Sequence, residues 1–331
     1  MLCFNDNYVL PAGVAIWSLL HHANQSCTYP IHVVHSDITQ EHQERLRKTV
    51  AKFPNASIDF MQTNAVLDDL WAATKGKFSF SKDVYCKMLV GDLFPQYQRI
   101  LITDVDVIFM GDIAPLFEKV PEEDFAYAGI QGLEHPAESP LGRWCAKNLI
   151  PMRVGRWEQN PNLSIGGGLL IANLDYLREH KLAEEMIACV HECGERLTQA
   201  EQDVINLVCG NVNVRLPLRA MMCSYYYPYA RKWKGWCASH EAHGYSEQEV
   251  REALAHPIQM HYAAGNLKPW NNLNVPKAWA WVCYCLRSGW FGDFAVRYLR
   301  LAPALTWGFL MRCWRFGLRK IGITKCVCGI G

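Results

Sequence analysis

Two aspartates separated by one valine follow a strongly apolar run in the first third of the chain. Asp104 and Asp106 come directly after Arg99-Ile-Leu-Ile-Thr103, and a second apolar run begins at Val107. Because alternate side chains of an extended chain share a face, both carboxylates can leave the end of a strand together. Two hard oxygen ligands suit Mg²⁺ or Mn²⁺, and such a metal suits a phosphate-bearing substrate. The motif is short, and a turn with two solvated acids fits it equally well.

A second segment that could do chemistry runs from His261 to Trp270, with the sequence His-Tyr-Ala-Ala-Gly-Asn-Leu-Lys-Pro-Trp. Its histidine is a borderline metal ligand, and Lys268 before a rigid Pro-Trp pair can supply a cation for phosphate. Taken singly, these residues are more simply a core histidine, a surface lysine and a packed tryptophan. Together with Asp104 and Asp106, they indicate a metal and phosphate site built from distant parts of the chain.

The segments that must position these residues alternate between strand and helix over the first 110 residues. Strands are expected at residues 31–35, 57–61 and 99–103, and helices at 39–53 and 82–93. This alternation predicts an α/β fold with a mostly parallel, Rossmann-like sheet and helices on both faces. In such sheets ligands bind at the carboxyl ends of the strands. The core is expected to continue with strands at 125–129 and 166–173 and a helix at 175–193. Residues 134–162 are expected to pass over the sheet.

The composition is that of a globular protein. Of 331 residues half are hydrophobic and one fifth charged, and the formal net charge is +1, so no nucleic-acid partner is expected. Fourteen cysteines are scattered through apolar stretches, which favours buried free thiols in the cytosol. The Cys-x-Cys pairs at 283 and 326 lack the usual zinc spacing. No run reaches the ~20 apolar residues of a spanning helix.

In the order of its motifs the chain resembles the family 8 glycosyltransferases, retaining enzymes related to bacterial lipopolysaccharide galactosyl- and glucosyltransferases and to glycogenin. The resemblance rests on Asn5-Asp-Asn-Tyr8, Tyr85-Cys-Lys87, Asp104-Val-Asp106, residues 165–174, Glu201-Gln-Asp203 and residues 261–270. It implies a GT-A type catalytic domain over residues 1–275. It also implies a hexosyltransferase that moves galactose or glucose from a UDP-sugar.

The resemblance implies roles for individual residues. Asp104, Asp106 and His261 would hold a divalent metal, Mn²⁺ in preference to Mg²⁺. Glu201 and Gln202 would act at the reacting sugar, and Gln131, where some relatives have an aspartate, would contact the acceptor. The residues implied in binding the UDP-sugar donor are Cys3, Asn5, Asn7, Tyr8, Lys87, Asp104, Val105, Asp106, Gly265 and Lys268.

Several positions depart from the usual pattern of the family. Lys268 lies seven residues after His261 instead of six, and Gly166-Gly-Gly168 replaces Asn-Ala-Gly or Asn-Ser-Gly. Asn5 and Lys87 replace an aspartate and an arginine, and lysine does not reproduce the two-pronged geometry of arginine. These changes concern the identity of the sugar and of the acceptor more than the class of reaction.

The chemistry of sugar transfer fits these residue types. Departure of UDP builds negative charge that a metal and a lysine stabilise, while the sugar carbon becomes cation-like. Because no second carboxylate nucleophile is evident, same-face attack supported by Gln202 is favoured, and a covalent intermediate stays open. The stretch Thr198-Gln-Ala-Glu201 could instead be a helix-capping pattern.

Two other functions stay open. Asp104-Val-Asp-Val107 superficially resembles the nucleophile motif of haloacid-dehalogenase-like phosphohydrolases, although that motif normally follows the first strand of a chain. A catalytically silent membrane protein that binds a UDP-sugar or glycan is the non-enzymatic alternative.

Residues 276–331 are expected to form a separate C-terminal helical region. From residue 287 to 325 there are eight Lys or Arg against one acid, Asp293, with aromatic residues interleaved. Such a helix suits an anionic membrane surface, although it could also pack its aromatics onto the catalytic domain. Membrane association would make this a peripheral enzyme on the cytoplasmic face of the bacterial inner membrane. There it would lie beside an acceptor such as lipopolysaccharide or another lipid-linked saccharide.

Overall fold

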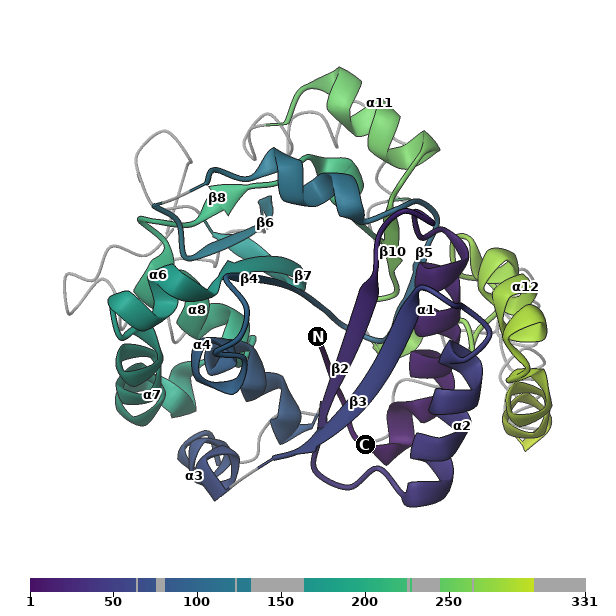
Figure 1. Cartoon of the computed structure of the whole chain (residues 1–331), viewed down its shortest axis with the longest axis horizontal. Helices are drawn as coiled ribbons and strands as arrows, with labels where there is room; N and C mark the ends of the chain where they lie inside the picture. The colour runs from purple at the N-terminus through teal and green to yellow at the C-terminus, as the bar shows by residue number, and fades with distance from the viewer. Residues whose placement is uncertain are drawn as a thin grey trace, which may run out of the picture.

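A seven-stranded sheet with the strand order β3-β2-β1-β4-β7-β6-β8 forms the centre of the structure, a computed structural model (Figure 1). The structure describes residues 1–63, 65–75, 81–122, 124–131, 164–224, 227, 245–263 and 265–300. The strands of this sheet are β1 (Leu2–Cys3), β2 (Tyr29–His35), β3 (Ala56–Gln62), β4 (Arg99–Thr103), β6 (Tyr127–Gln131), β7 (Ile165–Asn173) and β8 (Val214–Arg215). A smaller sheet has the order β5-β10-β9, from β5 (Val107–Phe109), β9 (Met221–Cys223) and β10 (Gln259–His261).

The direction of the strands is mostly parallel, as the sequence predicts. Strands β1, β2, β3 and β4 run parallel to one another, whereas β7 is antiparallel to both β4 and β6. The chain runs outward from β1 through β2 to β3 and then returns to the other side of β1 with β4. The strand order therefore reverses between β1 and β4, which is where open α/β sheets bind ligands.

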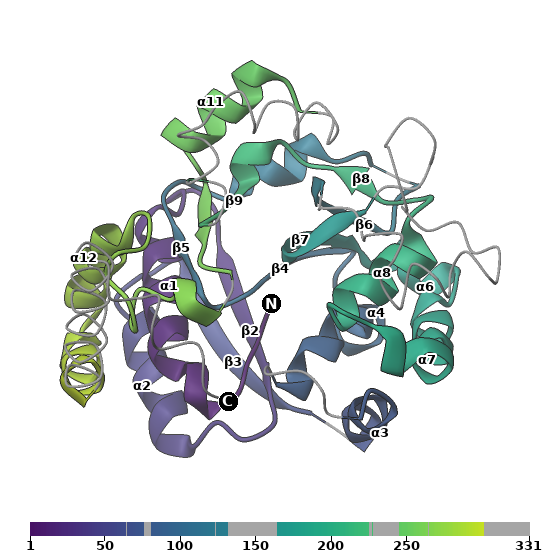
Figure 2. The same ribbon diagram turned by 180° about the vertical axis from the view of Figure 1, so that it is seen from behind.

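Helices cover both faces of the large sheet (Figures 1 and 2). The α-helices are α1 (Val9–His21), α2 (Gln40–Val50), α3 (Ala65–Ala73), α4 (Val90–Leu93), α6 (Leu174–Glu179), α7 (Leu182–Cys193), α8 (Glu201–Cys209), α11 (Glu247–Ala255) and α12 (Ala278–Ser288). Short 3₁₀ helices are η1 (Asp6–Tyr8), η2 (Lys82–Met88), η3 (Ala114–Lys119), η5 (Gly194–Arg196), η6 (Leu218–Ala220) and η7 (Gly265–Leu267). Helices α1, α2 and α12 lie on one side and α4, α6, α7 and α8 on the other. Each side has its own cluster of buried apolar side chains.

Burial explains why the local sequences form these elements. Strand β2 is apolar almost throughout because it lies inside the sheet with both faces covered, and only Pro30 is exposed. Strand β3 alternates between more and less exposed positions, as expected at the edge of a sheet. Helix α1 is buried along most of its length because it lies between β5, α2 and α12.

Some expected elements have different boundaries in the structure. The helix expected at 82–93 is divided into η2 and α4, and the helix expected at 175–193 is interrupted at Lys181, whose φ is 52°. The strand expected at 125–129 begins two residues later, at Tyr127. The segment 134–162, expected to pass over the sheet, lies outside the described residues.

The described part of the C-terminal region packs onto the side of the sheet that carries α1. Trp281, Trp290 and Phe294 are buried and belong to the same apolar cluster as α1. A β-carbon on Gly13 of α1 would lie 2.3 Å from the Trp290 indole, so the glycine permits this close contact. Residues 291–300 are helical, and residues 301–331 lie outside the described part. Of the helices that the structure describes, none has the length and apolar character needed to cross a membrane.

Candidate functional site

The carboxyl end of β4 carries the two aspartates, as the sequence predicts. Strand β4 ends at Thr103, and Asp104 and Asp106 lie in the turn that leads to β5. The Asp104 backbone N–H donates to the Gly168 carbonyl at 3.1 Å, and the Asp106 carbonyl accepts from Tyr262 N–H at 2.9 Å. Both ends of the turn are therefore fixed, by β7 and by the segment after β10.

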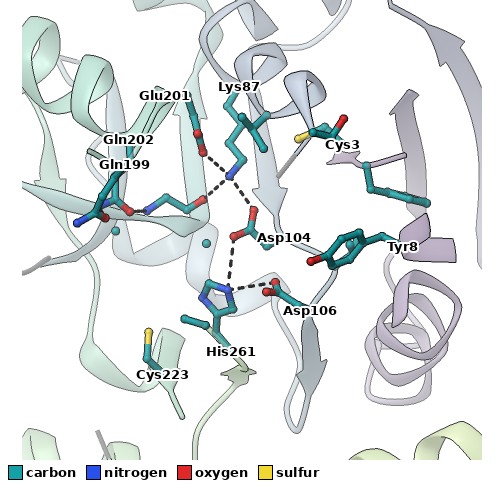
Figure 3. A pocket seen from close by; sticks show the side chains of 18 of the residues that line it. Cys3, Tyr8, Lys87, Asp104, Asp106, Gln199, Glu201, Gln202, Cys223 and His261 are labelled. Atoms are coloured by element: carbon teal, nitrogen blue, oxygen red, sulfur yellow. Dashed lines mark hydrogen bonds and ion pairs between the residues drawn. The ribbon is translucent and has the colours of Figure 1, made fainter. Parts of the chain in front are cut away.

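His261 lies beside both aspartates (Figure 3). It ends β10, which pairs antiparallel with β5 so that His261 is opposite Val107. Its Nε2 is 3.1 Å from Asp106 Oδ1 and 3.5 Å from Asp104 Oδ2. One ligand atom from each of the three residues lies within 4.8 Å of the others. Two carboxylates and one imidazole in this arrangement fit a divalent cation.

The charges around Asp106 are closely balanced. Burial alone would lower the pKa of His261, but the neighbouring Asp106 carboxylate raises it to about 10. Burial would raise the pKa of Asp106, yet His261 and then Lys268 hold it well below its usual range. Lys268 Nζ donates to Asp106 and, at 2.7 Å, to the Tyr262 carbonyl. The loop lysine therefore lies next to the metal-ligand cluster despite the extra residue between it and His261.

Lys87 forms the other side of the site. Its Nζ donates to Asp104 Oδ1 at 2.7 Å, to Glu201 Oε1 at 2.8 Å and to the Gly167 carbonyl at 3.0 Å. The residue is 1% exposed. Burial would lower the pKa of Lys87, but Asp104 and then Glu201 raise it well above its usual value. The Lys87 ammonium therefore stays charged and joins η2, the β4 turn and α8.

Glu201 and Gln202 begin α8 and face the pocket. Gln202 Oε1 accepts the Gly167 backbone N–H at 2.7 Å, and Glu201 contacts Lys87. The residue before the helix is Ala200, and no side chain caps the helix there. Thr198 is bonded instead to Asp203. The capping alternative for Thr198-Gln-Ala-Glu201 is therefore wrong.

These side chains surround one pocket of about 560 Å³ at the carboxyl ends of β1 and β4. On its β1 side Tyr8 packs edge-on against the buried Trp270, with ring centroids 6.3 Å apart. Asn5 Oδ1 is buried there without a hydrogen-bond partner. The implied site residues that line the pocket are Cys3, Asn5, Tyr8, Lys87, Asp104, Val105, Asp106, Glu201, Gln202, His261, Gly265 and Lys268.

Two implied site residues do not line this pocket. Asn7 is exposed in η1. Gln131 at the end of β6 is 2% exposed, and its backbone N–H donates to the Tyr245 hydroxyl at 2.9 Å. Both of its side-chain amide atoms are buried without a hydrogen-bond partner. Its acceptor role stays a prediction.

Sequence reasoning missed several lining residues. Gln199 lies beside Gln202, and Cys223 ends β9 opposite His261 (Figure 3). Met221-Met-Cys223 could have been read as a short buried strand. No periodic pattern points to Gln199; only its position two residues before Glu201 could have drawn attention to it.

Solved structures of several glycosyltransferases have a similar fold. The structure is similar to the bifunctional glycosyltransferase WbbM (TM-score 0.67, 20% identity, 90% of this chain and 51% of WbbM). It is also similar to the galactosyltransferase LgtC in complex with donor and acceptor sugar analogues (TM-score 0.65, 18% identity, 87% of this chain and 94% of LgtC). A third similar structure is the glycosyltransferase GlyE of Streptococcus pneumoniae (TM-score 0.59, 17% identity, 92% of this chain and 62% of GlyE). The chain thus spans about half the length of WbbM. No curated protein matches the sequence.

The fold shared with these structures is the GT-A type, so the predicted fold class is confirmed. The family model described as glycosyl transferase family 8 matches residues 1–274, which agrees with the extent of the resemblance in the sequence. The enzyme class that the motifs imply is confirmed with it, and the chain belongs to glycosyl transferase family 8.

Proposed function

We propose that this protein is a metal-dependent retaining glycosyltransferase that moves a hexose, galactose or glucose, from a UDP-sugar to a glycan acceptor. The observation that carries the proposal is the meeting of Asp104, Asp106, His261 and Lys268 with Glu201 and Gln202 in one pocket. Asp104, Asp106 and His261 suit a divalent metal that could bind a diphosphate, Lys268 suits the diphosphate itself, and the last two residues would lie beside a sugar attached to it.

The nucleotide would bind on the β1 side of the pocket. Tyr8 offers an aromatic face supported by Trp270, and Asn5 offers a carbonyl oxygen that has no other partner. Lys268 lies close enough to Asp106 to bring a positive charge to the diphosphate. Asp104, Asp106 and His261 would hold Mn²⁺, or Mg²⁺, which would stabilise negative charge on the departing diphosphate.

The sugar would lie between the aspartates and α8. Of the pocket carboxylates, Glu201 is paired with Lys87, and Asp104 and Asp106 belong to the metal set. No described lining carboxylate is thus left as a nucleophile, which supports same-face attack. Gln202 offers a neutral amide oxygen that can stabilise a cation-like sugar carbon without forming a bond to it.

The phosphohydrolase alternative fits the structure poorly. The Asp-x-Asp turn follows β4, the fourth strand along the chain, whereas the phosphohydrolase motif normally follows the first strand. Asp104 faces Lys87 and His261, and Asp106 faces His261 and Lys268, so cations from distant segments flank both carboxylates. Release of UDP from a UDP-sugar distinguishes an enzyme from a silent binding protein.

A membrane-associated acceptor is part of the proposal. Exposed large apolar side chains gather on α12 and residues 291–300, with Arg287, Arg297 and Arg300 in the same segment. This segment is bonded to the loop that follows Lys268, because Arg297 Nε donates to Asn271 Oδ1 at 3.1 Å. We therefore propose that the protein lies peripherally on an anionic membrane, the cytoplasmic face of a bacterial inner membrane. Its acceptor there would be lipopolysaccharide or another lipid-linked saccharide.

The test is release of UDP from a panel of UDP-sugars with Mn²⁺, with and without a lipopolysaccharide core acceptor. Fast release from UDP-galactose or UDP-glucose that increases with acceptor would support the proposal. Tight binding of UDP-sugar without hydrolysis or transfer would favour the silent binding protein. Hydrolysis of simple phosphoesters without turnover of any UDP-sugar would favour the phosphohydrolase.

A further inference from the structure

Gln199 lies beside Gln202 on the wall of the donor pocket (Figure 3). Gln202 Nε2 donates to Gln199 Oε1. The Gln202 backbone N–H also donates to the Gln199 carbonyl, at 3.1 Å. The side chain of Gln199 is thus next to the residue on which sugar transfer is proposed to depend.

The orientation of the Gln202 amide follows from its partners. The Gly167 backbone N–H can only donate, so the group that faces it at 2.7 Å must be the carbonyl oxygen Oε1 of Gln202. The Nε2 group must then point to the other side, where it needs an acceptor. Gln199 Oε1 is that acceptor, so a backbone donor and a side-chain acceptor hold the amide from both ends.

The backbone around Gln199 is itself fixed. The buried Asp203 accepts the N–H of Thr198 at 2.6 Å and that of Gln199 at 2.8 Å. Ala200, the next residue, has a φ of 45° and leads directly into α8. The backbone of Gln199 is therefore held at the start of the helix, and its exposed side chain lies at the wall of the pocket.

We propose that Gln199 is a positioning residue for sugar transfer, which keeps Gln202 Oε1 at the wall that carries Gly167, Lys87 and Glu201. This inference rests on the proposed function. The terminal torsion of a glutamine side chain has a broad, roughly two-fold preference, so without Gln199 the amide can turn away from Gly167. Loss of the Gln199 side chain would slow the transfer step, because Gln199 acts through Gln202.

The test compares Gln199→Leu, which removes the acceptor, with Gln199→Glu, which keeps an oxygen in its place. Gln248→Leu on α11, where Gln248 is exposed, is the matched control. We expect about tenfold lower kcat for Gln199→Leu, equivalent to about 1.4 kcal/mol in the activation barrier, with the donor KM within about threefold of wild type. Gln199→Glu and Gln248→Leu should keep kcat within about threefold, and melting temperatures would show that all variants fold.

Different results would overturn the inference and the proposed function. In an active enzyme, three results would overturn the role of Gln199. These are an unchanged kcat in Gln199→Leu, a rise in KM alone in that variant, or a loss of kcat in Gln199→Glu equal to that in Gln199→Leu. A wild type that turns over no UDP-sugar would overturn the proposed function instead. In that case the ¹⁵N resonance of the Gln202 side-chain amide, assigned with Gln202→Glu, still tests the contact. It should shift in Gln199→Leu and much less in Gln199→Glu, and an unchanged resonance in Gln199→Leu would count against the contact.

Discussion

The buried Lys87 ammonium lies 2.7 Å from the Asp104 carboxylate, at the wall of the pocket. The same ammonium is 2.8 Å from Glu201, so one buried cation joins the turn after β4 to the start of α8. An arginine has a planar fork of donors, whereas this lysine reaches its partners as a single point. The contacts of Lys87 with Asp104 and Glu201 therefore fix the distance between the proposed metal end and the proposed sugar end of the pocket.

Replacing Lys87 with methionine should destabilise the protein. The change removes the cation but leaves Asp104 and the buried Glu201 facing each other without it. Breaking a buried ion pair in this way costs about 3 kcal/mol. Urea denaturation would measure the loss, with Lys48→Met at an exposed position of α2 as the control, expected within about 0.5 kcal/mol of wild type. Equal stability of the two variants would show that the Lys87 contacts contribute little.

Asp104→Asn and Asp106→Asn should each abolish metal-dependent transfer. Each change removes one of the two carboxylates that lie beside His261. We expect UDP release at a fixed, low Mn²⁺ concentration to fall by at least about 100-fold, with partial recovery as Mn²⁺ is raised. Asp92→Asn, at an exposed position in α4, is the matched control. Near-normal turnover in either site variant would remove that aspartate from the mechanism.

Gly168→Ala tests the packing that holds His261. A β-carbon at Gly168 would lie 2.4 Å from His261 Nδ1 and 2.8 Å from Met221 Sδ, so His261 must move. We expect weaker Mn²⁺ binding and at least about tenfold lower activity, because displaced ligands bind metal less well. Gly292→Ala, where a β-carbon would meet no atom within 4 Å, should leave both unchanged. Wild-type Mn²⁺ affinity in Gly168→Ala would mean that His261 does not need its present position.

The sequence predicts the elements whose signals are local. The apolar runs at 31–35, 57–61 and 99–103 stand between polar segments, and each coincides with a strand in the structure. Pairing between distant segments is not visible in such runs. For this reason the antiparallel direction of β7 and the small sheet of β5, β9 and β10 were not predicted.

The site residues also differ in whether a local pattern or the pairing of distant segments places them. Asp104 and Asp106 could be found because a strand end and a two-residue spacing place them together. His261 and Lys268 were singled out by residue type, but their individual roles came from the family resemblance, since nothing local shows that β10 lies next to β5. Gln199 has no pattern at all, because its place depends on the hydrogen bonds of Asp203 and on the backbone of Ala200.

The ion pair between Arg45 and Asp293 should make stability depend on pH. The hydrogen bond from Arg45 lowers the pKa of Asp293 below its ordinary value. A carboxyl group with a depressed pKa in the folded state stabilises the protein above its unfolded pKa of about 3.9. This contribution is lost as the pH falls through the folded value. Because both side chains are about a third exposed, the effect should be at most about 1 kcal/mol.

Urea denaturation of Asp293→Asn and wild type would measure this effect. The two proteins should differ at pH 7 and converge as the pH falls below 3.9 toward acid. Arg45→Met is the background control, since Asp293→Asn should change little once its partner is absent. A difference that persists in the Arg45→Met background would assign the effect to another neighbour.

The exposed apolar surface of the C-terminal region should bind anionic membranes. Trp279 and Leu286 are 67% and 62% exposed on one face of α12, seven residues apart, and Leu299 is 71% exposed in the following helix. Truncation after residue 286 would also remove the buried Trp290 and Phe294 and so disturb the core. Substitution of Trp279, Leu286 and Leu299 by serine avoids this problem.

The triple serine variant should bind vesicles containing anionic lipid at least about tenfold more weakly than wild type in a flotation assay. Burying three large side chains in the acyl boundary contributes several kcal/mol, about 1.5 kcal/mol or more for each. Val66→Ser is the matched control, because Val66 is also exposed (39%) but lies on α3. Unchanged flotation of the triple variant would show that these helices do not contact the membrane. Stronger binding at low salt than at high salt would assign part of the attraction to Arg287, Arg297 and Arg300, because exposed charges are screened by salt.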